Sequence, residues 1–190
     1  MELNSKPHRK SVTHTIRIDS EIMDNLTRLA QKERTSLNQV IATALRTYTQ
    51  WENSADRLGM VEIHDKALGL LFESMDEKTA RGIGRRVGQN SWTESIVYVY
   101  KDLNYQNLFS ILENRGQFGH FFVFEKSEEP DVDVLILNHH YGHKATVYLS
   151  EALKAVLEAT RLPFDIEEME DQVLVRVNLR PLEQPVLHQR

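Results

Sequence analysis

The sequence contains no cysteine, which excludes disulfide bonds, thiolate metal ligands and a cysteine nucleophile. It also has no apolar run near the ~18 residues that a transmembrane helix needs, so the sequence predicts no membrane span. Residues 1–11 are polar and basic and lack the apolar core of a secretory signal. We therefore expect a cytoplasmic protein that does not associate with membranes.

Sequence motifs of common enzyme classes are missing as well. The chain has no GxSxG nucleophile elbow, no HExxH zinc motif and no phosphate-binding loop. Its 190 residues, of which 41% are apolar and 27% charged, have the composition of one or two ordinary folded domains. These features favour a binding protein and not an enzyme.

Charge is unevenly distributed along the chain, although the formal net charge is only −5. Residues 1–50 hold 8 Lys and Arg against 5 Asp and Glu, whereas residues 51–190 hold 15 against 23. An imbalance of this size can arise by chance, but a basic N-terminal part on an acidic remainder suggests an anionic partner for the N-terminal part alone.

The N-terminal part has the pattern of a strand followed by two helices. Residues 12–18 alternate in the β period and are rich in β-branched side chains. Asp19 and Ser20 offer N-cap oxygens for a first amphipathic helix, and Ser36 offers one for a second. About 40 residues cannot bury a sufficient core alone, and a single strand leaves its backbone groups unpaired. The pattern therefore predicts a homodimer.

Thr13-His14-Thr15-Ile16-Arg17-Ile18, followed by Ser36-Leu37-Asn38, makes residues 12–51 resemble the ribbon-helix-helix DNA-binding domain of the Arc, MetJ and CopG type. The resemblance implies that two strands pair across a dimer and enter the major groove of double-stranded DNA. His14 stands where the family usually has an apolar residue. Arg34 stands near a common glycine position, so it either adds a phosphate contact or marks a different turn.

The resemblance also implies which residues contact DNA. Alternate strand residues would face the bases, and the start of the second helix would hold a phosphate. Basic residues before the strand would follow the DNA backbone. The residues implied to contact DNA are Thr13, Thr15, Arg17, Ser36, Leu37, Asn38, Arg34, Lys10 and Arg9.

The rest of the chain mixes strand and helix patterns, which predicts an α+β fold: an N-terminal ribbon-helix-helix dimer domain followed by a separate α+β domain. Residues 66–72, 76–88, 104–114 and 145–160 are predicted as helices. Residues 61–63, 95–100, 120–125, 132–137, 165–169 and 173–179 are predicted as strands, with a helix from residue 93 as an alternative for the second of these. The predicted divisions are a basic arm (1–11), the DNA-binding domain (12–51), a linker (52–59), an effector or oligomerisation domain (60–180) and a tail (181–190).

The second domain offers two kinds of candidate ligand site. His139, His140 and His143 follow an apolar strand, and clustered imidazoles can bind a transition metal. The competing interpretation is a histidine-rich turn with no metal. Several aromatic residues between 118 and 148 suggest instead an apolar pocket for a small organic effector, or plain core. The sequence favours no particular cofactor.

These observations predict a transcription regulator, for example a repressor, that binds DNA as a homodimer or a higher homo-oligomer and senses a signal or oligomerises through its second domain. The alternative is an antitoxin-like interaction protein that regulates its own synthesis through its DNA-binding part. An enzyme fused to a DNA-binding domain is a third interpretation.

Overall fold

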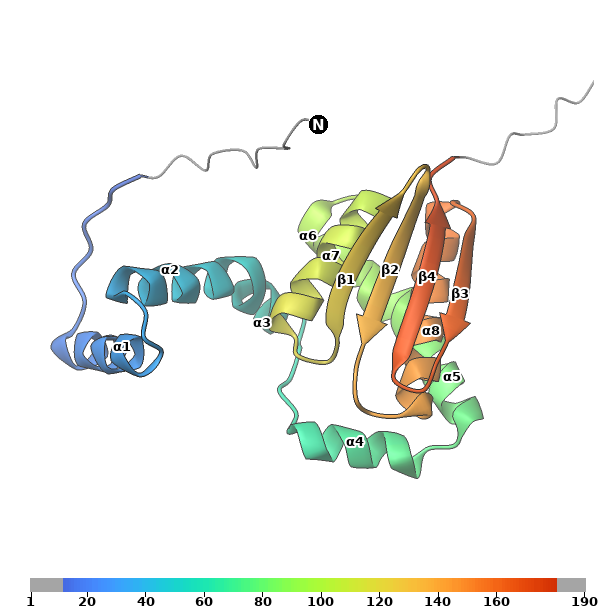
Figure 1. The fold of residues 1–190 in the computed structure, drawn as a ribbon, viewed down its shortest axis with the longest axis horizontal. Helices are drawn as coiled ribbons and strands as arrows, with labels where there is room; N and C mark the ends of the chain where they lie inside the picture. The colour runs from blue at the N-terminus through green and yellow to red at the C-terminus, as the bar shows by residue number, and fades with distance from the viewer. Residues whose placement is uncertain (1–11, 181–190) are drawn as a thin grey trace, which may run out of the picture. The chain divides into compact units, whose positions relative to one another are not determined.

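The computed structural model describes residues 12–180 and divides the chain into two compact units, Met1–Arg46 and Thr47–Arg190. Among the described residues, the first unit contains helices and no strand, whereas the second contains a four-stranded sheet and the remaining helices (Figure 1). The unit boundary lies before the predicted one. Residues 52–59, predicted as a linker, belong to the second unit and include helix α3 (Asn53–Arg57).

The first unit consists of α1 (Ser20–Lys32) and α2 (Leu37–Thr47), joined by a short turn. Asp19 precedes α1 in an extended conformation, and Glu21 lies in the first turn, where a negative charge suits the helix dipole. The two helices form where the sequence predicted them, because both the apolar periodicity and the capping residues mark their limits.

The predicted N-terminal ribbon-helix-helix architecture is wrong. Residues 12–19 form no strand, and each strand of the described chain lies C-terminal to residue 122. A strand requires backbone hydrogen bonds to a neighbouring strand, and no described segment pairs with residues 12–19. The protein is α+β overall, with helices first and strands last.

Helices occupy most of the first half of the second unit. They are a π-helical segment η1 (Tyr48–Glu52), α3, α4 (Asp65–Ser74), α5 (Glu77–Val87), a second π-helical segment η2 (Gly88–Trp92), α6 (Thr93–Tyr100) and α7 (Tyr105–Phe118). N-cap side chains fix where α5 and α7 begin. Asp76 before α5 accepts from the Thr79 N–H at 2.7 Å, and Asn104 before α7 accepts from the Asn107 N–H at 2.9 Å.

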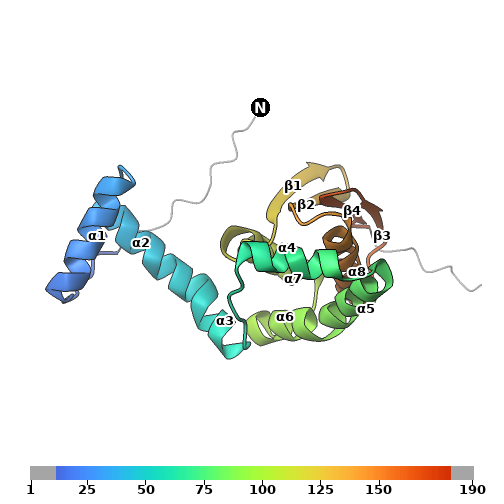
Figure 2. The same ribbon diagram turned by 90° about the horizontal axis from the view of Figure 1, so that it is seen from below.

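The sheet comprises β1 (Val123–Glu129), β2 (Val132–Asn138), β3 (Phe164–Glu168) and β4 (Gln172–Asn178), with α8 (His143–Thr160) between β2 and β3. All neighbouring strands are antiparallel, in the order β1-β2-β4-β3. Helices α7 and α8 lie against one face of the sheet, and no helix of this unit up to residue 180 covers the other face (Figures 1 and 2).

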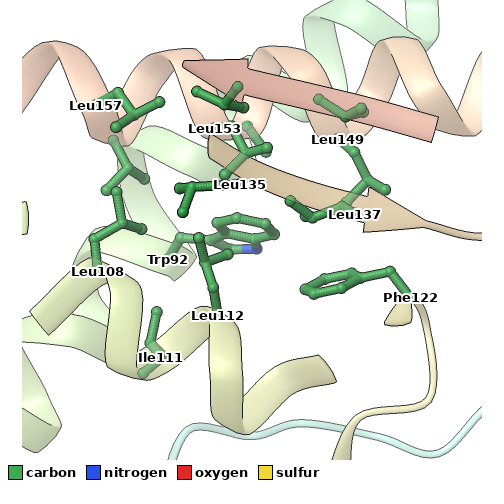
Figure 3. Close-up of a cluster of buried hydrophobic side chains, with 14 of the residues drawn as sticks. Trp92, Leu108, Ile111, Leu112, Phe122, Leu135, Leu137, Leu149, Leu153 and Leu157 are labelled. Atoms are coloured by element: carbon green, nitrogen blue, oxygen red, sulfur yellow. The ribbon is translucent and has the colours of Figure 1, made fainter. Parts of the chain in front are cut away.

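Alternation along the strands selects the buried face. Val173, Val175 and Val177 of β4 are buried, whereas Arg176 between them points to the opposite face and pairs with Glu167. The core fills the space between this sheet face, α7 and α8, with Trp92 of η2 at its centre (Figure 3). Its fully buried side chains include Leu108, Leu112, Leu135, Leu137, Leu149, Leu153 and Leu157.

The predicted strands at residues 61–63 and 95–100 are absent. Residues 61–63 have no regular structure, and residues 95–100 belong to α6, as the alternative helical prediction required. The two final strands, the β2 strand and the long helix before them are present near their predicted limits. No helix in residues 12–180 is long and apolar enough to cross a membrane.

Candidate functional site

The residues implied to read DNA bases lie in the first unit, before α1. Thr13, Thr15 and Arg17 are exposed in the segment of residues 12–19. They are therefore available to a partner molecule, although this segment is not a strand. Lys10 and Arg9 lie outside the described residues.

The turn between α1 and α2 ends α1 in a Schellman motif. The Thr35 N–H donates to the Ala30 carbonyl at 3.0 Å, and the Arg34 N–H donates to the Gln31 carbonyl at 3.2 Å. Arg34 itself is exposed and has φ of +53°, a left-handed conformation that favours glycine. The turn thus has the glycine-type geometry with an arginine in it, which presents a cation beside the start of α2.

Ser36 caps α2, as the sequence predicted. Its hydroxyl oxygen accepts from the Gln39 N–H at 3.1 Å. Leu37 is half-buried and Asn38 is exposed. The structure thus brings Arg34, Ser36 and Asn38 together on one exposed turn, where the helix dipole and a positive side chain both favour an anion.

The first unit leaves much of its apolar surface uncovered. Ala30 and Val40 are the buried residues among those described in this unit. Ile16, Ile22 and Leu45 are each more than half exposed, and Leu29 is 40% exposed. Apolar side chains on both helices would gain free energy by burial against another surface.

The three histidines predicted as metal ligands have separate environments. The His139 side chain is fully buried, and both its ring nitrogens have partners: Nε2 lies 3.0 Å from the Thr146 hydroxyl, and Nδ1 accepts from the Tyr141 N–H at 3.2 Å. Burial lowers the pKa of His139, against a smaller opposing effect of Asp171. A neutral ring with both nitrogens engaged cannot also bind a metal without breaking a hydrogen bond.

His140 and His143 do not complete a ligand set. His140 is exposed and lies 2.9 Å from Asp65, which also accepts from the Tyr141 hydroxyl at 2.6 Å. His143 is exposed at the start of α8. Within residues 12–180 no group of three or more His, Asp or Glu side chains is placed to hold a metal ion. The structure therefore does not support the predicted metal site.

The aromatic residues that suggested an effector pocket are mainly packed against each other. Phe121, Phe72, Tyr141 and Tyr148 form one cluster, with Phe72 and Phe121 stacked at 5.8 Å between ring centroids. Phe122 belongs to the main core. Burial, together with the bond to Asp65, raises the pKa of Tyr141 to about 12, so this phenol stays neutral. These rings stabilise the fold and do not line one pocket.

A buried acid at the edge of the core is fully paired. Asp133 of β2 accepts from the Tyr105 hydroxyl at 2.7 Å and lies 3.1 Å from the Lys126 ammonium. Both partners compensate for the loss of hydration, so this group is explained by stability alone.

Arg115 of α7 is the functional candidate that the sequence did not indicate. Its Nη2 donates to the Ser95 hydroxyl at 3.3 Å, and its guanidinium carbon lies 5.1 Å from the Trp92 ring centroid. Its Nε is buried and has no hydrogen-bond partner in the described part of the chain. Burial lowers the pKa of Arg115. No local motif reveals such a site, because an arginine on an amphipathic helix is ordinarily exposed.

Comparison of the whole chain with models of known protein families and with curated proteins finds no match. The resemblance of residues 12–51 to DNA-binding domains therefore stays a prediction, and the geometry of the two units is the basis for assigning a function.

Proposed function

We propose that the protein is a cytoplasmic, homodimeric transcription regulator that binds double-stranded DNA through its first unit and senses a signal through its second. The main supporting observation is the first unit itself, which exposes apolar side chains on both helices beside a polar and cationic turn. A second copy of the chain is the natural cover for the apolar surface, because two identical small units can complete one core.

The positions of the exposed polar side chains fit a DNA contact. Thr13, Thr15 and Arg17 offer donors and a methyl group to base edges, and arginine can donate two hydrogen bonds to guanine. Arg34 and the capped start of α2 offer a cation and backbone N–H groups to a phosphate. Acidic residues predominate in the rest of the chain, so the DNA is expected to bind at the N-terminal unit alone.

Selection from a random duplex library with the full-length chain tests DNA binding. We expect enrichment of one sequence and an affinity that falls as salt rises. Arg17→Ala should weaken binding to the selected duplex by about 1–3 kcal/mol and to random duplex by less. Arg28→Ala is the matched control, since Arg28 is an exposed arginine of α1 that bonds Asn25. Lack of both enrichment and salt dependence would refute the proposal.

Native mass spectrometry of the full chain tests the dimer. The expected species has twice the 22.1 kDa mass of one chain. Ile22→Asp should yield a monomer because it puts a charge on the exposed apolar surface of α1, whereas Gln31→Asp on the same helix should leave the dimer intact. A second, different protein in the same complex would support the antitoxin-like alternative.

A further inference from the structure

The guanidinium of Arg115 has too few partners for its degree of burial. Ser95 is its one hydrogen-bond partner within residues 12–180, and Trp92 provides a stacking surface but no negative charge. Its Nε is shielded from solvent and unpaired. Arg115 as a whole is half-buried, but a buried, unpaired donor on its guanidinium costs free energy, since hydration is lost at that atom and nothing replaces it. A ligand that supplies the missing negative charge would remove this cost.

Arg115 borders a hollow in the second unit. The hollow is small, with a volume of about 30 Å³, and partly open to solvent; it lies between η1 and α3 on one side and α6 and α7 on the other. Trp51, Leu58, Val99 and Ile111 give it apolar walls, and Ser95 and Asn114 are polar residues beside Arg115. Among the residues that the structure describes, Arg115 is the one charged side chain that lines it.

The neighbouring polar groups are already engaged with the protein. The Ser95 hydroxyl donates to the Ser91 carbonyl at 2.6 Å, and the Asn114 amide nitrogen donates to the Tyr100 hydroxyl at 3.3 Å. Gln50 and Ser54 also line the hollow as neutral polar residues, so the guanidinium is the charged donor that a ligand would meet there. A phosphate, which presents several acceptor oxygens and up to two charges, would be poorly satisfied here, whereas a carboxylate matches a single guanidinium.

One tryptophan lines the hollow, and the other is a core residue that contacts the Arg115 guanidinium. Trp51 lies in η1 and lines the hollow, and Trp92 lies in η2 beneath Arg115. Each π-helical segment adds an extra residue to a turn, and such segments frequently occur at functional sites. The π-helical segment η2 places Trp92 against the guanidinium and η1 places Trp51 in the wall of the hollow, which is a second indication of a ligand site.

We propose that Arg115 and the adjoining hollow bind a small organic monocarboxylate, with the carboxylate on the guanidinium and the apolar part against Trp51, Leu58 and Val99. The site lies wholly within the second unit, so the proposal does not depend on DNA binding. The hollow has room for little more than the carboxylate group, so we expect short acids whose apolar part lies along its open rim.

Titration of the full-length protein with butyrate, hexanoate and benzoate tests this site. The neutral amides of the same acids serve as matched probes, and inorganic phosphate tests the other anion class. Intrinsic fluorescence reports binding, because the chain has two tryptophans, of which Trp51 lines the hollow and Trp92 contacts Arg115. We expect at least one carboxylate to saturate at millimolar concentration or below, to raise Tm, and to bind at least about tenfold more tightly than its amide.

Arg115→Gln removes the charge and should weaken carboxylate binding at least about tenfold. Arg86→Gln, which makes the same change at an exposed arginine of α5, should bind as the wild type does. The wild-type comparison of acid with amide keeps the test valid if Arg115→Gln fails to fold. Absence of saturable carboxylate binding, equal binding of acid and amide, or unchanged affinity in Arg115→Gln would overturn the proposal. Binding of phosphate without binding of any carboxylate would overturn the assignment of monocarboxylates as the ligand class.

Discussion

His139 shows how one buried side chain makes stability depend on pH. Its imidazole is held neutral by burial, so its pKa in the folded state lies below the value near 6.5 of the unfolded chain. As pH falls through about 6.5, the unfolded state binds a proton that the folded state resists, and the free energy of unfolding decreases. Stability from this residue is fully present above that pH.

His139→Gln should reduce this pH dependence, because glutamine keeps a donor and an acceptor but does not titrate. We expect the free energy of unfolding, measured by urea denaturation, to fall less between about pH 8 and pH 5 in the variant than in the wild type. His140→Gln removes an exposed histidine instead and should retain the wild-type loss. An identical pH profile for His139→Gln and the wild type would contradict the assignment.

Arg34 combines an unfavourable backbone conformation with an exposed charge. At φ of +53° an arginine is less stable than glycine, so Arg34→Gly should raise the free energy of unfolding by about 0.5–1 kcal/mol. If the side chain contacts a DNA phosphate, the same variant should bind DNA more weakly at every sequence.

Arg34→Asn separates the two effects, because asparagine tolerates the left-handed region but carries no charge. Denaturant titration and fluorescence anisotropy on a labelled duplex measure stability and affinity respectively. Unchanged DNA affinity in both variants would exclude Arg34 from the DNA contact.

At the scale of elements, glycine positions control how closely α5 approaches α8. A Cβ on Gly84 would overlap the backbone carbonyl of Tyr148, whereas a Cβ on Gly82 would meet nothing within 4 Å. Gly84→Ala should therefore cost about 1–3 kcal/mol by forcing the helices apart. Gly82→Ala, on the exposed side of the same helix, should stabilise the protein by up to about 1 kcal/mol. Similar effects of the two substitutions in thermal denaturation would refute this packing argument.

Local sequence patterns predicted those elements whose own residues determine them. The two N-terminal helices, α8 and the final strand pair have strong periodicity and clear caps or turns. Residues 95–100 have β-branched and aromatic side chains typical of a strand, yet they form α6. Trp92, Ser95 and Ile96 are buried at the i, i+3, i+4 spacing of one helical face. Residues 12–18 have an equally strong strand pattern but no pairing segment within the described chain.

At the scale of the whole molecule, the candidate ligand site lay beyond sequence analysis. Arg115, Ser95 and Trp51 come from three separate elements, and their proximity depends on how α7 packs against α6 and the η1–α3 segment. The three histidines show the reverse relation between distance in sequence and distance in space. They lie within five residues of the sequence, but the turn between β2 and α8 directs the His139 ring into the core and leaves His140 and His143 exposed. Proximity along the chain did not produce a shared site.

The segments proposed to bind DNA and a carboxylate follow each other directly along the chain. Whether the carboxylate regulates DNA binding can therefore be tested. Residues of η1 and α3 form one wall of the Arg115 hollow, and η1 begins at the residue after α2 ends. A carboxylate that fixes this wall can alter the stability of α2, the helix whose start is proposed to hold a phosphate. We therefore expect a saturating carboxylate to change affinity for the selected duplex by about 5–150-fold, the range of ordinary allosteric coupling.

Fluorescence anisotropy with a labelled duplex, with and without the best-binding carboxylate, measures this coupling. Arg115→Gln should bind the duplex but lose its response to the carboxylate, while Arg17→Ala should keep carboxylate binding and lose affinity for the duplex. By reciprocity, the duplex must change carboxylate affinity by the same factor as the carboxylate changes duplex affinity. If the carboxylate binds at Arg115 and duplex affinity stays constant, the second unit does not regulate the first through this site, although each binding activity would remain.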